Sequence, residues 1–132
     1  MLLTSLTSLL ALAATAHAAA WGSLCNPELR TGGVCDSVGT CNSFGGKPVP
    51  GFCPGLPGDV QCCVTKHCMP ARACPVLPKS GHCPGGADIK LCPGYRAFCS
   101  PKALCDKQPR RVKWTSGYCP GGSDFRLCVI RA

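Results

Sequence analysis

A run rich in leucine and alanine opens the chain, and the later apolar residues occur in short alternating segments. Three of these segments join an apolar residue to a polar or basic one shortly before a cysteine: Val60-Gln61, Ile89-Lys90 and Phe125-Arg126. Alternation with a period of two turns one set of side chains toward the interior and the other toward solvent. The pattern therefore predicts three short β-strands, each with one face turned inward.

A Cys-Pro-Gly tripeptide precedes each predicted strand, and an aspartate stands between the two. Pro-Gly suits the centre of a type II turn, because glycine tolerates the positive φ at the second position. We expect Asp59, Asp88 and Asp124 to accept hydrogen bonds from nearby backbone amides and close these turns. Calcium binding would need several oxygen ligands around one point. Acid–base catalysis would need a partner group within reach of the same substrate bond. Each aspartate stands alone in its own turn. A structural role is therefore favoured for all three.

A pattern of four cysteines occurs three times, and the first cysteines of successive copies are 33 and then 31 residues apart. A fixed period indicates one small unit that is copied, so we expect a fold built unit by unit instead of one continuous core. The units contain Cys35, Cys41, Cys53 and Cys63, then Cys68, Cys74, Cys83 and Cys92, then Cys99, Cys105, Cys119 and Cys128. Cys25 and Cys62 lie outside the pattern and are expected to pair. The predicted fold class is small and disulfide-rich, with three tandem cysteine-knotted units of about 30 residues, short β-strands and turns, and little helix.

The expected organisation begins with a signal peptide at residues 1–20, cleaved after Ala18 or Ala20. Units at 21–65, 66–94 and 95–132 follow. The apolar run is shorter than the roughly 20 residues that a membrane anchor needs. Secretion places all fourteen cysteines in an oxidising compartment, which predicts disulfides. Zinc ligation would favour paired Cys-x-x-Cys motifs, which the sequence lacks, so we expect no metal and no cofactor.

The first unit, extended by Cys25 and Cys62, has six cysteines that end in an adjacent pair. This spacing resembles the clip domain of arthropod serine proteases. The resemblance implies the pairs Cys25–Cys62, Cys35–Cys53 and Cys41–Cys63. By repetition, the other pairs are Cys68–Cys83, Cys74–Cys92, Cys99–Cys119 and Cys105–Cys128. The phrase GGKPVPGFCPGLPGDVQCC also resembles the cysteine-rich modules of secreted fungal cell-wall hydrolases of the lysozyme type, which would imply a small secreted fungal protein that acts as an accessory module standing alone.

Charge is divided unevenly along the chain. Residues 19–65 hold two basic side chains against three acidic ones, a net charge of −1, whereas residues 66–131 hold twelve against three, a net charge of +9. The densest basic segment lies in the long gap between Cys105 and Cys119 and just before it, which predicts an exposed basic loop. A solvated loop that aids solubility is the simpler interpretation. The alternative is a contact for an anionic surface, made by Lys102, Lys107, Arg110, Arg111, Lys113, Trp114 and Tyr118.

The sequence contains no motif of a known catalytic centre, and Glu28 is its only glutamate, so we expect no enzymatic activity. The favoured function is that of a secreted cationic protein that binds a cell-wall or other extracellular polysaccharide, or an anionic surface such as a membrane. An antimicrobial or effector-like toxin is one alternative. Inhibition of a secreted enzyme through the loop at residues 78–81 is another. Nucleic acid is an unexpected partner for a secreted protein.

Overall fold

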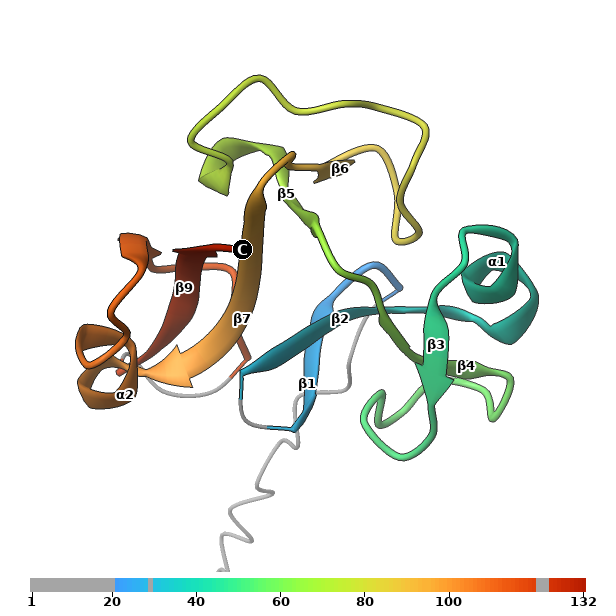
Figure 1. Ribbon diagram of the computed structural model, residues 1–132. Helices are drawn as coiled ribbons and strands as arrows, with labels where there is room; N and C mark the ends of the chain where they lie inside the picture. The colour runs from blue at the N-terminus through green and yellow to red at the C-terminus, as the bar shows by residue number, and fades with distance from the viewer. Residues whose placement is uncertain (1–20, 29, 121–123) are drawn as a thin grey trace, which may run out of the picture.

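The computed structural model describes residues 21–28, 30–120 and 124–132, so the expected signal peptide lies outside the described residues. Three antiparallel sheets follow one another along the chain (Figure 1). The first contains β1 (Leu24–Glu28), β2 (Thr31–Ser37), β3 (Lys47–Val49) and β4 (Val60–Val64), in the order β1-β2-β4-β3. The second pairs β5 (Cys68–Pro70) with β6 (Ile89–Leu91), and the third has the order β7-β9-β8, from β7 (Tyr95–Pro101), β8 (Arg111–Thr115) and β9 (Phe125–Arg131).

Helices are short in the described residues. They comprise α1 (Val38–Ser43), the single 3-10 turn η1 (Ala71–Ala73) and α2 (Lys102–Asp106). The protein is therefore mostly strand with little helix, as the sequence predicts. None of these helices is long and apolar enough to cross a membrane.

The three predicted strands are confirmed as β4, β6 and β9, which begin at Val60, Ile89 and Phe125. The aspartate before each strand has an equivalent place in every sheet. Its backbone carbonyl accepts a hydrogen bond from the N–H of the first residue of a short helix. The donor–acceptor pairs are Val38 and Asp59 at 2.8 Å, Ala71 and Asp88 at 2.8 Å, and Lys102 and Asp124 at 2.9 Å. The three carboxylates are exposed, and no hydrogen bond reaches them within the described residues. The equivalence therefore rests on the backbone and not on the expected side-chain turn closure.

The predicted turns are present where the structure describes them. Gly55 and Gly85, each the residue after the proline, have φ values of 80° and 94°. This left-handed region favours glycine because it lacks a Cβ atom. The third turn includes residues 121–123 and lies outside the described part of the chain.

Disulfides replace much of the apolar core. The structure contains seven, and they are the pairs expected from the resemblance and the repeat: Cys25–Cys62, Cys35–Cys53, Cys41–Cys63, Cys68–Cys83, Cys74–Cys92, Cys99–Cys119 and Cys105–Cys128. Each one restricts the unfolded chain and typically contributes about 2–4 kcal/mol, although such contributions do not simply add. The sulfur atoms of Cys25, Cys35 and Cys53 also come close together, but oxidation leaves no thiolate there for a metal ion.

The expectation of a separate core in each unit needs correction, because the buried clusters cross the unit boundaries. Met69, from the second predicted unit, packs with Leu127 and Val129 from the third. Val34, from the first, packs with Cys83 and Ile89 from the second. Segments of about 30 residues bury too little apolar surface alone, so the buried clusters extend across neighbouring segments.

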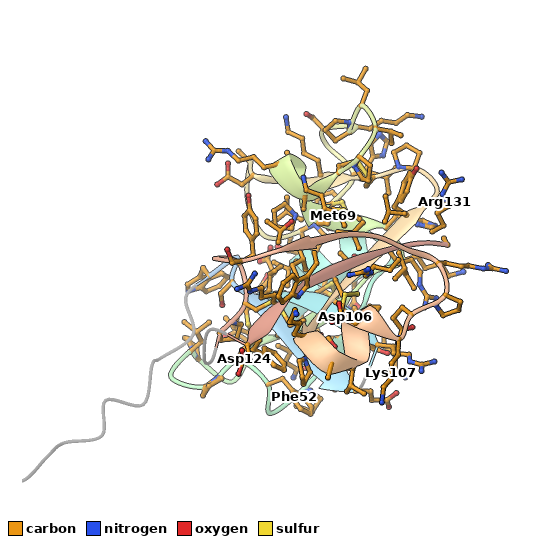
Figure 2. All side chains as sticks on the ribbon, turned by 90° about the vertical axis from the view of Figure 1, so that its left-hand side faces the viewer. Phe52, Met69, Asp106, Lys107, Asp124 and Arg131 are labelled. Atoms are coloured by element: carbon orange, nitrogen blue, oxygen red, sulfur yellow. A yellow bond between two sulfur atoms is a disulfide. The ribbon has the colours of Figure 1, made fainter. Side chains whose placement is uncertain are left out.

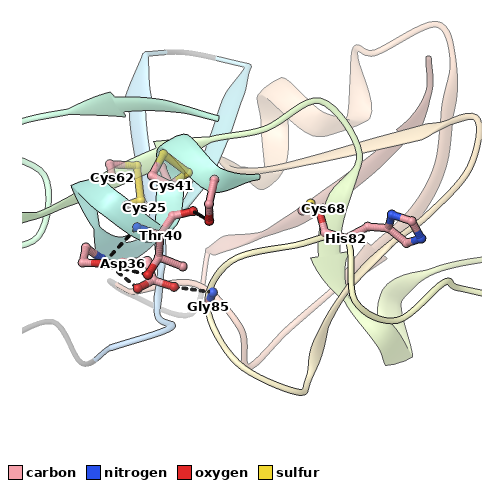
Figure 3. The surroundings of a disulfide bond; sticks show 11 residues. Cys25, Asp36, Thr40, Cys41, Cys62, Cys68, His82 and Gly85 are labelled. Carbon is pink, nitrogen blue, oxygen red and sulfur yellow. Dashed lines mark hydrogen bonds between the residues drawn. A yellow bond between two sulfur atoms is a disulfide. The ribbon is translucent and has the colours of Figure 1, made fainter. Parts of the chain in front are cut away.

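Polar contacts fix how the sheets sit against one another. The Asn26 side chain pairs with the backbone of Cys99 in β7: its amide nitrogen donates to the carbonyl at 2.8 Å, and its oxygen accepts from the N–H at 3.1 Å. The Asp36 carboxylate accepts from the Gly85 N–H at 2.8 Å (Figure 3). These bonds join the first sheet to the third and to the second, so a surface between sheets has a defined shape.

Candidate functional site: a cationic cleft between the sheets

A cleft of about 500 Å³ opens where the three sheets meet. The first sheet supplies the turn that leads into β2 and the start of β3. The connection from β4 to β5 supplies residues 64–68, and β7 supplies Arg96 and Ala97. Its volume lies within the range of about 300–1,000 Å³ that is typical of small-molecule sites.

Positive charge dominates the cleft. Arg30, Lys47, Lys66 and Arg96 line it with exposed side chains, and no acidic residue belongs to the lining that the structure describes. Two of these cations, Arg30 and Lys47, are the whole basic complement of residues 21–65. Concave walls of low dielectric focus such a field and raise the local concentration of anions.

Two histidines add titratable nitrogen atoms to the same wall. His67 lies between β4 and β5, and its Nδ1 is 2.8 Å from the carbonyl oxygen of Tyr95. This contact orients the imidazole of His67 within the lining. His82 is exposed and reaches the cleft from the loop before β6.

A close approach between two backbones brings the cations together. A Cβ atom on Gly32 would lie 2.3 Å from the carbonyl oxygen of Ala97, so only glycine allows the start of β2 to sit this near β7. Arg30 and Arg96, two residues before Gly32 and one before Ala97, are thereby carried to the same cleft.

Arg30 has a backbone conformation that is rare for its residue type. Its φ is 68°, in the left-handed region where side chains with a Cβ atom are strained. Strain of this kind costs of order 1–3 kcal/mol and is often found at functional sites. The arginine is exposed, so packing does not explain the choice of this side chain.

The basic segment singled out in the sequence lies elsewhere and is not a loop throughout. It forms α2, a turn and β8, which pairs with β9. In Figure 1, α2 and β9 lie on the opposite side of the molecule from α1 and β3. Lys102, Lys107, Arg110, Arg111 and Lys113 are exposed, as expected.

Several of these charges already have partners within the protein. Asp106 accepts a hydrogen bond from Arg111 at 2.8 Å and lies 3.8 Å from the ammonium of Lys102. Lys113 donates to the backbone carbonyl of Arg72 at 3.0 Å. Figure 2 shows Asp106 at the end of α2 and Lys107 directly after it. Each such surface pair contributes only about 0–1 kcal/mol, but the carboxylate lowers the field on this face.

The two aromatic residues proposed from the sequence take part in internal packing. Trp114 is half-buried against the cluster of Phe98, Cys105 and Cys128. The guanidinium of Arg126 lies 3.8 Å from the centre of its ring, which is a cation–π contact. Tyr118 is half-buried against the cluster that contains Met69 and Leu127.

Phe44 is an aromatic residue of the cleft that the sequence reasoning missed. It follows α1, lines the cleft and is 38% exposed. It is far along the chain from every cation of the cleft except Lys47, so no local sequence motif predicts its place in the cleft.

No family model and no solved structure matches the chain. It is similar to an uncharacterized secreted protein of Arthroderma benhamiae, at 36% identity over 73 residues. The match covers 54% of this chain and 29% of that protein's length.

The similarity to a secreted protein agrees with the seven disulfides, which require an oxidising compartment. The chain is a secreted, disulfide-rich protein.

Proposed function

We propose that the protein is a non-catalytic binding protein of the extracellular space, and that it binds an acidic polysaccharide in the cleft between the sheets. One observation carries the proposal: Arg30, Lys47, Lys66 and Arg96 surround a concave surface that no acidic side chain lines among the described residues. An anionic ligand would neutralise charges that otherwise repel one another. A sugar polymer fits the extracellular location better than a nucleic acid does.

The absence of catalysis is part of the proposal. Acid–base chemistry on a glycosidic bond ordinarily uses two carboxyl groups that flank the bond. No carboxyl group lines the cleft in the described residues, and its titratable acid–base groups are the two histidines. Recognition of an anionic sugar by cations and one aromatic ring requires no acid–base group.

We also propose that three tandem units form the scaffold of this site. Each disulfide closes within one of the ranges 21–65, 66–94 and 95–132, so covalent bonds hold every unit in shape. The cleft lies where the units meet. A repeat in which each copy contributes part of one site explains why the unit is copied.

The experiment is a binding assay of the mature protein with polygalacturonate, a soluble polymer of uronic acids, at low salt and at 0.5 M salt. The screening length falls from roughly 30 Å at 0.01 M to roughly 3 Å at 1 M. We expect tight binding at low salt and steep loss at high salt. Insoluble chitin, β-glucan and peptidoglycan serve as comparison surfaces. Salt-independent retention on neutral chitin or β-glucan, without affinity for the acidic polymer, would contradict the proposal.

Inhibition of a secreted enzyme is the second candidate, and one observation favours it. Leu77 is 88% exposed and Val76 is 41% exposed, at the tip of a loop that two prolines flank. Proline fixes φ, so an apolar tip of this kind loses little conformational freedom when it enters a pocket. Lys79 lies in the loop at residues 78–81 that is proposed from the sequence for inhibition. It is less suited to enter the pocket of an enzyme, because its backbone N–H and carbonyl are both hydrogen-bonded to Leu91. Inhibition of a secreted protease that is lost in Leu77→Ala would favour this candidate.

A membrane-disturbing toxin has less support. Such proteins commonly use an amphipathic helix that lies in the membrane interface. The longest helix in the described residues, α1, has six residues. The polygalacturonate assay can be paired with leakage of anionic vesicles, where we expect no release.

A further inference from the structure

A second cleft, of about 460 Å³, lies beside the cationic one. It lies between α1 and the segment from Ser80 to Lys90, which precedes and enters β6. Among the described residues, Phe44 is the one that lines both clefts.

The second cleft differs from the first in charge. Lys90 is its one cation within the described lining, and Asp36 is its one acid. Both carboxylate oxygens of Asp36 accept hydrogen bonds from the backbone, one from Ser37 at 2.7 Å and the other from Gly85 at 2.8 Å. The two formal charges cancel, and the surface is close to neutral.

Hydroxyl groups and glycines make up much of the remaining lining. Thr40 accepts a hydrogen bond from the Ser37 hydroxyl at 2.8 Å, and the Ser80 side chain is exposed. Hydroxyls can donate and accept, so they suit a ligand that is itself rich in hydroxyls. Figure 3 shows Thr40 and Asp36 beside Gly85, with His82 farther along the same loop.

On the basis of the binding function proposed above, we propose that the two clefts form one two-part groove for an acidic oligosaccharide. A sugar unit with a carboxylate lies among Arg30, Lys66 and Arg96. A neutral unit of the same chain lies between Thr40 and Ser80, and the ring of Phe44 contacts the apolar face of the sugar between them. Phe44 is therefore the residue that determines how long a ligand must be.

This arrangement favours a polymer of alternating charge over a uniformly charged one, which would occupy the first cleft alone. Every repeat of a nucleic acid or polyuronate carries a negative charge, and the second cleft offers such a repeat one cation with an acid nearby. Desolvating an anion without a counter-charge costs free energy. A polymer that alternates acidic and neutral sugars avoids this cost.

The test uses hyaluronan fragments, which alternate a uronic acid with a neutral amino sugar, and oligogalacturonate of equal length, which is charged at every unit. Affinities of the disaccharide and the hexasaccharide are measured for the native protein, and backbone amide shifts report which cleft is occupied. We expect the hyaluronan hexasaccharide to bind about tenfold more tightly than its disaccharide, a difference of about 1.4 kcal/mol. The hexasaccharide is expected to shift the amides of Thr40 and Ser80, and the disaccharide is not.

Two phenylalanine variants separate the role of the ring from a general loss of apolar surface. Phe44→Ala should weaken the binding of both fragments, because Phe44 also lines the first cleft, and it should remove the gain of the hexasaccharide over the disaccharide. Phe52→Ala is the matched control, because Phe52 is 40% exposed and lines neither cleft. It should keep the full gain. Unchanged disulfide pairing and thermal unfolding establish that both variants fold.

The outcomes distinguish the two-part groove from the binding function. Equal affinity of both hyaluronan fragments, with the amides of Thr40 and Ser80 unshifted, would overturn the groove and leave binding in the first cleft intact. Tighter binding of hexagalacturonate than of the hyaluronan hexasaccharide would overturn the selection for alternating charge. If no acidic fragment binds at low salt, the binding function and the groove both fail.

Discussion

The cationic cleft and the basic segment of residues 102–113 illustrate two ways of placing positive charge on one protein. The segment gathers five basic residues within twelve positions of the sequence, and the structure sets Asp106 between two of them. The cleft gathers four from positions 30, 47, 66 and 96, and no acidic residue lines it in the described part of the chain. Charge density along a sequence therefore does not predict where uncompensated charge lies in space.

The two regions also depend differently on the rest of the fold. Lys102 and Asp106 are four residues apart on α2, and β8 pairs with β9 of the same sheet, so the basic segment mostly needs local structure. The cleft exists only while the first sheet stays against β7 and the second sheet. A change that moves the sheets apart should abolish one region and spare the other.

Gly32→Ala should produce the largest effect on this comparison. The added Cβ atom would lie 2.3 Å from the Ala97 carbonyl oxygen, so β2 and β7 must separate. Overpacking of this kind typically costs about 1–3 kcal/mol. We expect the free energy of unfolding, measured in denaturant without reductant, to fall by this amount. We also expect polygalacturonate to bind at least tenfold more weakly.

Gly39→Ala is the matched control for Gly32→Ala. Gly39 lies in α1, and a Cβ atom there would meet nothing within 4 Å. Alanine in a helix is more stable than glycine by roughly 0.5–1 kcal/mol, so this variant should be slightly stabilised and bind normally. Equal behaviour of the two variants would contradict the dependence of the cleft on sheet contact.

Asp36→Ala and Asp88→Ala should differ in stability, although both remove one carboxylate. Asp36 accepts a local backbone hydrogen bond from Ser37 and a long-range one from Gly85, in the loop before β6. The long-range bond to this charged group contributes about 1.5–3 kcal/mol. We expect a loss of about 2 kcal/mol for Asp36→Ala in denaturant unfolding. The exposed Asp88 carboxylate accepts no hydrogen bond in the described residues, so Asp88→Ala should stay within about 0.5 kcal/mol of the native protein. A larger loss for Asp88→Ala would restore the turn-closing role predicted from the sequence.

Arg30→Gly should change stability less than Gly32→Ala or Asp36→Ala does, and in the opposite direction. Glycine relieves the left-handed strain at φ 68°, which costs about 1–3 kcal/mol. Part of this gain is lost, because glycine makes the unfolded chain more flexible and so raises the entropy cost of folding. We expect a net gain of about 1 kcal/mol and a severalfold loss of polygalacturonate affinity. If stability rises while affinity is unchanged, Arg30 is not part of the binding surface.

Local features of the fold could be predicted from the sequence. The strands at Val60, Ile89 and Phe125 and the turn glycines Gly55 and Gly85 depend on residues a few positions away. The pairing of Cys25 with Cys62 followed from finding both outside a repeat. These features repeat with the unit, so one copy predicts the next.

The candidate site could not be predicted, because it depends on which surfaces of the sheets meet. Nothing local indicates that Asn26 will bind the backbone of Cys99, which is 73 residues away, or that Gly32 will lie against Ala97. One error was avoidable. Lys102 and Asp106 have the spacing of a helical ion pair, and this spacing predicts part of the charge compensation that the structure contains.

The most direct test of the account compares two triple variants that remove the same charge from the two regions. Lys47, Lys66 and Arg96 become glutamine in the first variant, and Arg110, Arg111 and Lys113 become glutamine in the second. Polygalacturonate affinity is measured for both and for the native protein at low salt. Three exposed ion pairs at up to about 1 kcal/mol each predict a loss of about 10-fold to 100-fold in the cleft variant. We expect a loss below about threefold in the second variant. A loss there equal to or greater than that of the cleft variant would place binding on the basic segment and not in the cleft.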